Sequence, residues 1–408
     1  MLGRTRIPTC EKMTSFFNLD GCRFGTFIQS RHTYGRFPTA KELSVSSVSE
    51  VPNPSADCAT SSFSSHRFLR TRRVLSLGSA AVAMLCASAA SPPSPQPADP
   101  PPAQSAQSAT ERDFPMRIIA YVANSGSASV SSFDVRLERP VTTTPVGNGP
   151  TGVGAAPDGS HVYVANGLSD SVSFIETTGH KVVATVPVGK YPFAAMPSRD
   201  GKRVLTADWG SDTVSVIDTA TRQVTATTPV GELPHSITTI PDGRAFVTNS
   251  GTNDITVLSK TNQVETRIPV GDFPSGITST RGGEKVYAAN TGSGSISVID
   301  AATAKVTATW PVGKAPLGLA VSPDGQRLYA ADSAADVLLI IDTATGGVLA
   351  RVPVGKTPQG VAISPGGSRV WVTNEASDTV SVVDPATAKV RTTLPTGHLP
   401  EGIAITPR

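Results

Sequence analysis

From residue 116 onward, short apolar runs alternate with turn-forming sequences. In residues 316–355 the runs are GLAVS, RLYAAD, DVLLIID and VLARVPV, and turn signals such as PDG and TATGG lie between them. Each run has the length and the Val, Ile, Leu and Tyr content of a β-strand. Asp-Gly and Gly-Gly between such runs favour hairpins, because glycine accepts positive φ without steric cost. The segment therefore predicts four short strands joined by tight turns.

The same pattern recurs along the chain. Val-Gly pairs stand at 146–147, 188–189, 230–231, 270–271, 312–313 and 354–355, Thr396-Gly397 takes the seventh place, and the spacing is 40 or 42 residues. A proline follows three residues after each of these glycines. Four strands per repeat of about 40 residues are typical of a propeller blade. We therefore predict an all-β fold over residues 116–408, a seven-bladed β-propeller of four-stranded antiparallel blades.

The repeat region is incomplete at both ends in complementary ways. The second strand of the repeat occurs seven times, from Tyr121–Asn124 to Trp371–Asn374, yet no first strand precedes Tyr121. A first strand stands alone at the other end, at Gly402–Ile405. We expect the C-terminal strand to complete the first blade, which would leave the ring without an open edge.

Polar residues that recur in every repeat are expected to be structural. Aspartates of the SPDG-type turns, namely Asp158, Asp200, Asp242 and Asp324, should hold those turns. Asparagines at the ends of second strands, namely Asn166, Asn249, Asn290 and Asn374, are expected to bond local backbone. Function should therefore be sought where the repeats differ.

Three short motifs mark the repeats: YVAN followed by VSVID, V-G-x-x-P, and SPDG. Together they resemble the YVTN-repeat β-propeller proteins, and the resemblance covers about residues 116–408. SRDG at 198–201 and Ser259 in place of an aspartate depart from the pattern. The resemblance implies the fold. Such repeats occur in exported and surface-layer proteins and in relatives of lactonase-like enzymes and haem d1 propellers, so the resemblance leaves the activity open.

The first 115 residues differ from the repeats in composition. Residues 1–66 are polar and Ser-rich, and we expect a disordered leader or a segment outside the natural product, whose translation would start near Leu69. Residues 67–90 begin with four arginines, continue with the apolar run Val74–Cys86 and end in small residues. This order is typical of a secretory signal peptide, and a buried core helix is the alternative. Residues 91–115 form a Pro/Ala/Ser-rich linker.

This organisation predicts a secreted, periplasmic or cell-surface protein, exported by the Sec or the twin-arginine route. All four cysteines precede residue 91, so the mature part would fold without disulfides. The chain has no run of 18 uncharged apolar residues, so we expect no transmembrane helix in the mature form. A monomer is expected.

The charge balance argues against a nucleic-acid partner. The whole chain carries 35 Lys and Arg against 32 Asp and Glu, a net charge of +3. Residues 116–408 carry 23 against 24, so the small excess belongs to the N-terminal 115 residues, with 12 against 8. Phosphate-backbone binding needs a concentrated basic face, and we expect none here.

Candidate site residues stand where first strands begin, because these strands should surround the mouth of a central channel. After the repeat proline the residues are Thr151, Phe193, His235, Ser275, Leu317, Gln359 and Glu401. Trp209 and Glu375 follow second strands, where other repeats have small polar residues. Tyr191, Phe193, Trp209 and His235 fall on two adjacent blades and could anchor a ligand or partner. The alternative is that Tyr191 and Phe193 fill space between blades.

Metal and nucleophile signatures are weak. The mature region has only His161, His180, His235 and His398, without HExxH spacing, and it lacks G-x-S-x-G, a P-loop and an EF-hand pattern. His235 could be a general base or an axial haem ligand, as in propellers related by the resemblance, or simply a structural residue. No metal and no cofactor are expected.

Two functions follow from these observations. We expect a binding module whose face and channel mouth hold a protein, peptide or glycan partner through Tyr191, Phe193, Trp209, His235, Gln359, Glu375 and Glu401. The alternative, which the resemblance implies, is an enzyme of lactonase-like, quinoprotein or haem d1-related type with its site at the channel mouth. We expect binding rather than catalysis.

Overall fold

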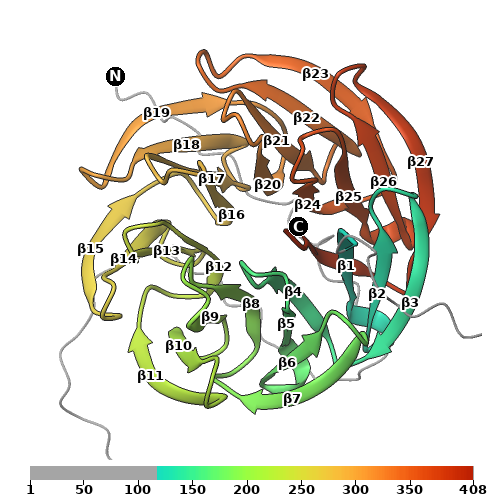
Figure 1. Ribbon diagram of the computed structural model, residues 1–408. Coiled ribbons are helices and arrows are strands. Elements are labelled where there is room, and N and C mark those ends of the chain that lie inside the picture. Colours follow the sequence, from blue (N-terminus) through green and yellow to red (C-terminus); the bar gives the residue numbers. More distant parts are fainter. Residues whose placement is uncertain (1–116, 408) are drawn as a thin grey trace, which may run out of the picture. The chain divides into compact units, whose positions relative to one another are not determined.

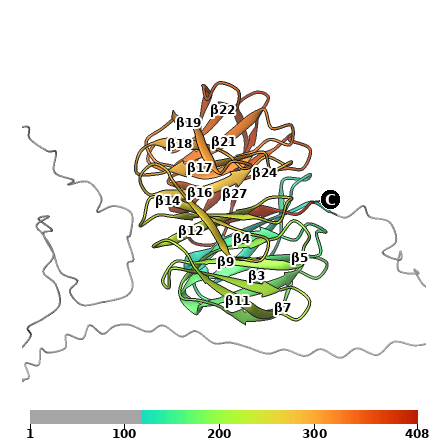
Figure 2. The same ribbon diagram turned by 90° about the vertical axis from the view of Figure 1, so that its left-hand side faces the viewer.

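Seven four-stranded antiparallel sheets surround a central channel in the computed structural model, which describes residues 117–407 (Figure 1). The predicted seven-bladed propeller is confirmed. Seen from the side, the C-terminal end lies at one face of the ring (Figure 2). The predicted leader, signal peptide and linker, residues 1–66, 67–90 and 91–115, lie outside the described residues. Helices in the described part are single 3-10 turns, and none could cross a membrane.

Each blade contributes its first strand to the channel and its fourth strand to the rim. Blades 1 to 4 consist of β28 (Pro400–Ile405), β1 (Ile119–Asn124), β2 (Ser129–Asp134) and β3 (Arg139–Pro145); β4 (Pro150–Ala155), β5 (His161–Asn166), β6 (Ser171–Glu176) and β7 (Lys181–Pro187); β8 (Pro192–Pro197), β9 (Arg203–Asp208), β10 (Thr213–Asp218) and β11 (Gln223–Pro229); and β12 (Pro234–Thr239), β13 (Ala245–Asn249), β14 (Asp254–Leu258) and β15 (Val264–Pro269). Blades 5 to 7 consist of β16 (Pro274–Ser279), β17 (Lys285–Asn290), β18 (Ser295–Asp300) and β19 (Lys305–Pro311); β20 (Pro316–Val321), β21 (Arg327–Asp332), β22 (Val337–Asp342) and β23 (Val348–Pro353); and β24 (Pro358–Ile363), β25 (Val370–Asn374), β26 (Thr379–Asp384) and β27 (Lys389–Pro395).

The two ends of the propeller close the ring by pairing. β28 is the innermost strand of blade 1 and runs antiparallel to β1, with Ala120 opposite Ile405 and Val122 opposite Ile403. Ile119 N donates to Thr406 Oγ1 at 3.0 Å, and Thr406 N donates to the Ile119 carbonyl at 2.9 Å. The expected closure by the C-terminal strand is therefore confirmed, and all seven sheets have the same strand number.

Middle strands are buried on both faces because each blade packs against two others. The residues of β1, for example, are all buried. Hydrophobic clusters combine consecutive blades, and the cluster at the closure joins Val122 and Phe133 of blade 1 to Trp371 of blade 7. The rings of Phe133 and Trp371 lie 5.9 Å apart. The closing interface is thus packed like the others rather than being a seam.

The recurring polar residues hold the blades internally, with one correction. The turn aspartates behave as expected: Asp200 Oδ1, for instance, accepts from Lys202 N at 3.1 Å. The strand-end asparagines, however, donate mainly to hydroxyls of the neighbouring third strand. Asn166 Nδ2 donates to Ser171 Oγ at 3.2 Å and to Ser173 Oγ at 2.9 Å. Side chains of the third strand are therefore the main partners, and of the four asparagines Asn374 alone also bonds backbone as predicted, because its Oδ1 accepts from Gly355 N at 3.1 Å.

Glycine two places after the repeat proline lets neighbouring first strands touch backbone to backbone. A Cβ atom on Gly318 of β20 would collide with the carbonyl oxygen of Gln359 on β24. Blades 3 and 4 have Ala194 and Ser236 at this place, and their first strands resume pairing one residue earlier than that of blade 6. The glycines therefore allow neighbouring first strands to approach each other closely around the channel.

The close strand contact predicts that Gly318→Ala lowers the free energy of unfolding by about 1–3 kcal/mol, since the methyl group forces two backbones apart. Gly366→Ala is the matched control, because a Cβ atom there meets nothing within 4 Å. We expect the control to stay within about 0.5 kcal/mol of the parent protein in denaturant titrations. Equal stability of the two variants would contradict the proposed backbone contact.

Candidate functional site

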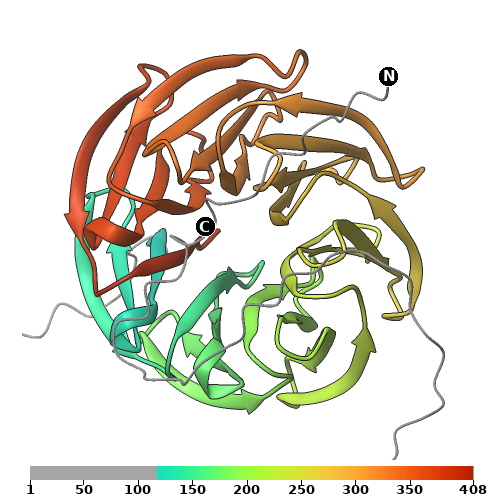
Figure 3. The same cartoon turned by 180° about the vertical axis from the view of Figure 1, so that it is seen from behind.

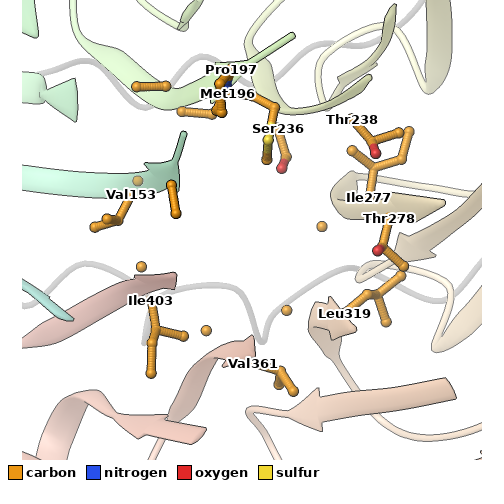
Figure 4. Close-up of a pocket in the computed structure, with 18 of the residues that line it drawn as sticks. Val153, Met196, Pro197, Ser236, Thr238, Ile277, Thr278, Leu319, Val361 and Ile403 are labelled. Atoms are coloured by element: carbon orange, nitrogen blue, oxygen red, sulfur yellow. The ribbon is translucent and has the colours of Figure 1, made fainter. Parts of the chain in front are cut away.

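The first strands of all seven blades enclose a central cavity of about 700 Å³. In Figure 4 labelled side chains from the inner strands surround this cavity, and Figure 3 shows the ring of blades from behind. The walls are mostly small or aliphatic, for example Val153, Ser236, Ile277, Leu319, Val361 and Ile403. Specific chemistry is therefore concentrated at the two ends of the channel.

At one end, the start of each first strand meets the loop that follows the second strand. Trp209 N donates to the Tyr191 carbonyl at 3.1 Å, and Glu375 N donates to the Thr357 carbonyl at 3.1 Å. The two sets of loops therefore lie on the same face of the ring. Of the seven residues that follow the repeat proline, six line the cavity, while Ser275 is buried outside it. The seven candidate residues, Tyr191, Phe193, Trp209, His235, Gln359, Glu375 and Glu401, are all partly exposed.

The four ring-bearing candidates of blades 3 and 4 form one chain of contacts. Ring centroids are 5.7 Å apart for Tyr191 and Trp209, 6.2 Å for Tyr191 and Phe193, and 4.1 Å for Phe193 and His235. The Tyr191 ring also packs over Gly167 of blade 2, where a Cβ would lie 3.4 Å from it. Tyr191 therefore does fill space between blades, while Phe193 and His235 also line the cavity.

His235 is neutral at physiological pH, because burial lowers its pKa to about 4. Its Nδ1 atom is buried and has no hydrogen-bond partner among residues 117–407. Within the same residues, no three His, Cys, Asp or Glu side chains gather so that they could hold a metal ion. The histidine thus stands in the wall of the mouth as an uncharged aromatic ring with one unused polar atom.

Three further candidates, on blades 7 and 1, form an acidic group at the same mouth. Gln359 Nε2 donates to Glu375 Oε2 at 2.5 Å. Burial raises the pKa of Glu375, and this hydrogen bond opposes the rise. Burial raises the pKa of Glu401 to about 7, the charge of Glu375 adds to this, and a hydrogen bond with Ser125 opposes it. Neither glutamate forms an ion pair with a described residue.

The aromatic and acidic groups belong to one neighbourhood. Burial raises the pKa of Tyr191, and the charge of Glu401 raises it further. The phenol therefore lies within the electrostatic reach of the carboxyl group. The mouth accordingly presents carboxyl and amide groups on blades 7 and 1, and aromatic rings on blades 3 and 4.

The opposite end of the channel carries two residues that the sequence analysis did not select. Arg199 and Arg281 both line the cavity there, after the ends of β8 and β16. The departure of SRDG at 198–201 from SPDG is a signal in the sequence for the first of them. Their proximity to each other depends on the tertiary structure.

A family model described as a YNCE-like β-propeller matches residues 109–245 and 246–365. No curated protein matches the chain. Among solved structures, hydrazine synthase of Kuenenia stuttgartiensis is 22% identical with a TM-score of 0.59, over 65% of this chain and 92% of that one.

Two further structures carry enzyme names. A putative 6-phosphogluconolactonase of Bacteroides uniformis is 17% identical with a TM-score of 0.61, over 71% of this chain and 99% of that one. A dihydro-heme d1 dehydrogenase, NirN, is 18% identical with a TM-score of 0.54, over 71% and 75%. At such identities the likeness shows the fold alone.

The raised pKa of Glu401 predicts a pH-dependent cost. The pKa of Glu401 is about 7 in the folded protein and 4.5 for a free glutamate. Ionising Glu401 therefore destabilises the folded protein progressively as the pH rises from about 4.5 to about 7, and the destabilisation remains at higher pH. Glu401→Gln mimics the protonated form. We expect it to be more stable than the parent protein at about pH 8, on the order of 2 kcal/mol, and equally stable at about pH 4.

Denaturant titrations at the two pH values check this expectation. Glu265→Gln is the control, because Glu265 lies exposed on the outer strand β15, and it should change stability little at either pH. A Glu401→Gln variant that is less stable than the parent protein at about pH 8 would show that the carboxylate is favourably solvated or paired.

Proposed function

The chain belongs to the YNCE-like β-propeller family, and we propose that it is an exported binding module whose channel mouth holds a basic peptide segment of a protein partner. The mouth is defined by Tyr191, Phe193, Trp209, His235, Gln359, Glu375 and Glu401. Export rests on the signal-like residues 67–90.

The observation that carries this proposal is that Glu375 and Glu401 are half-buried and form no ion pair with a described residue. Desolvation and mutual repulsion both disfavour the charged forms of Glu375 and Glu401. A lysine or arginine side chain of a ligand would relieve both effects and form charge-assisted hydrogen bonds. Gln359 already fixes one carboxylate oxygen of Glu375, so the acceptor geometry is set before the ligand arrives.

The aromatic residues extend the same recognition. Trp209 and Tyr191 are partly exposed and lie with their rings 5.7 Å apart. Aromatic faces attract cations and bury the aliphatic stems of basic side chains. Rigid aromatic side chains are also frequent anchors at interfaces, because ordering them costs little entropy. A basic peptide would therefore find both charge and apolar contact at one mouth.

A lactonase-like activity is the second candidate, and one observation favours it. A carboxyl group with a pKa near 7, as Glu401 has, is suited to general acid–base catalysis at neutral pH. A structural neighbour also bears the name of a putative 6-phosphogluconolactonase. In this case Glu401 would take a proton from the water that attacks a lactone carbonyl. We rank it second, because the other carboxyl group beside it, that of Glu375, is already engaged in a hydrogen bond from Gln359.

The charge argument predicts which peptides bind. Peptides selected from a random library on the full-length chain at about pH 8 should be rich in Lys and Arg, since Glu401 is then largely ionised. Their affinity should fall at least about tenfold at about pH 5.5, where Glu401 is protonated, and likewise in Glu375→Gln and Glu401→Gln. Binding is measured by isothermal titration calorimetry, with Glu265→Gln as the unaffected control.

Other results of the same work would replace the proposal. Selection of peptides without basic residues, or affinity that is unchanged in both glutamate variants, would contradict it. A purified protein that is coloured or holds metal would support the enzyme alternative, as would hydrolysis of a lactone that Glu401→Gln abolishes. An absorption spectrum with metal analysis is the quickest of these measurements.

The aromatic anchor gives an independent prediction. Trp209→Ala should weaken the selected peptides about tenfold or more while leaving the fold intact, because Trp209 contributes contact area at the mouth. Leu349→Ala is the matched control, since Leu349 is 54% exposed on the outer strand β23 and lies far from the mouth in the blade. Equal affinity of the two variants would place the binding surface elsewhere.

A further inference from the structure

The far end of the channel is marked by a repeat position that departs from the pattern twice, both times to arginine. In the turn between the first and second strands, the second residue is proline in four blades, namely Pro157, Pro241, Pro323 and Pro365, and Pro407 holds the equivalent place after β28. Blades 3 and 5 have Arg199 and Arg281 instead. A tight turn needs no arginine there, so the shared change requires another explanation.

The two arginines reach the same opening from either side of blade 4. Both line the central cavity, at the end opposite Glu401. Inner strands of six residues span about 20 Å, which separates the two ends. Arg199 Nε donates to the Thr239 carbonyl of blade 4 at 3.0 Å, and its Nη2 donates to Ser279 Oγ of blade 5 at 3.3 Å. Arg199 is exposed at this opening, but these two hydrogen bonds hold its guanidinium in place across three blades.

No carboxylate balances this pair. Neither Arg199 nor Arg281 forms an ion pair with a residue of 117–407, whereas Arg244, Arg327 and Arg369 pair with Asp242, Asp342 and Glu138. Partial desolvation by the surrounding protein and the positive charge of Arg281 both lower the pKa of Arg199. Two neighbouring cations at a partly closed opening repel each other, and an anion between them would remove that repulsion.

We infer that this end of the channel binds a phosphate monoester of a small molecule between Arg199 and Arg281. Two unbalanced positive charges match a dianion better than a carboxylate. Arg199 uses two of its five N–H groups within the protein, so three remain, and Arg281 adds five. Guanidinium groups bind phosphate oxygens in pairs. Ser279 and Thr238, whose hydroxyls lie 3.2 Å apart, offer further hydrogen bonds in the cavity wall.

The enclosure favours a small molecule over a nucleic acid. The cavity of about 700 Å³ continues inward from the arginines along walls of small and aliphatic residues, so an organic group can follow its phosphate into the channel. A nucleic-acid backbone offers singly charged diesters and needs a wide basic face, which the net charge of −1 over residues 116–408 does not provide. This site is independent of the peptide site proposed at the other mouth.

The test is calorimetric titration of the full-length chain, in phosphate-free buffer of low ionic strength, with inorganic phosphate, glycerol 3-phosphate and acetate. We expect both phosphates to bind with a Kd of about 1 mM or lower, and acetate at least about tenfold more weakly. Arg281→Gln and Arg199→Gln should each weaken binding about tenfold or more. Arg136→Gln, which removes an exposed arginine outside the cavity, should change nothing.

Folding of the variants can be separated from binding. Arg199→Pro and Arg281→Pro restore the residue that other blades carry at this place, and circular dichroism should show the parent fold. No hydrogen bond from the Arg281 side chain is seen within residues 117–407, so its variants keep the test valid even if Arg199 variants fail to fold. Absence of phosphate binding, or equal binding by the Arg281 variants, would overturn the inference. Binding of a duplex oligonucleotide in place of glycerol 3-phosphate would overturn it as well.

Discussion

The pairing of β28 with β1 is the contact on which the rest of the structure depends. Each blade buries its middle strands only if a blade stands on either side, so an open ring would leave two faces of the core in water. The C-terminal strand removes that opening with a ladder between β28 and β1 and with the exchange between Ile119 and Thr406. The closing strand also carries Glu401. Pairing of β28 with β1 therefore closes the ring and at the same time brings Glu401 to the acidic group at the mouth.

The repeated scaffold explains why functional residues stand where they do. Every blade needs its turn aspartate or an equivalent, its strand-end polar residue and its interblade packing, so these positions have little freedom. Most residues at the two ends of the channel are not needed for these turns and contacts. At one end the departures are aromatic and acidic, and at the other they are Arg199 and Arg281. The channel consequently has ends of opposite charge, although residues 116–408 are nearly neutral as a whole.

Burial at the channel ends converts ordinary side chains into groups with altered proton affinity. Desolvation moves the pKa of His235 down to about 4 and that of Glu401 up to about 7. His235 therefore stays neutral, and Glu401 is partly protonated near neutral pH. In both proposed sites, unbalanced or partly buried charge makes an unfavourable contribution to folding. The groups stay together because several blades hold them in place. Ligands of opposite charge are the simplest means of relieving that cost.

The amino-acid sequence was sufficient for the blade number, the strands and the ring closure, because a period of about 40 residues and alternating apolar runs are local signals that seven copies reinforce. It also placed Phe193, His235, Gln359 and Glu401 near the mouth, since they share one register position. Only the tertiary structure decided which of these residues meet: the ring contact of His235 with Phe193, the hydrogen bond from Gln359 to Glu375, and the burial of Ser275 away from the cavity. It likewise brought Arg199 and Arg281, 82 positions apart in the printed sequence, to one opening. Distance, desolvation and shared partners arise from the packing of different blades, and no single repeat contains them.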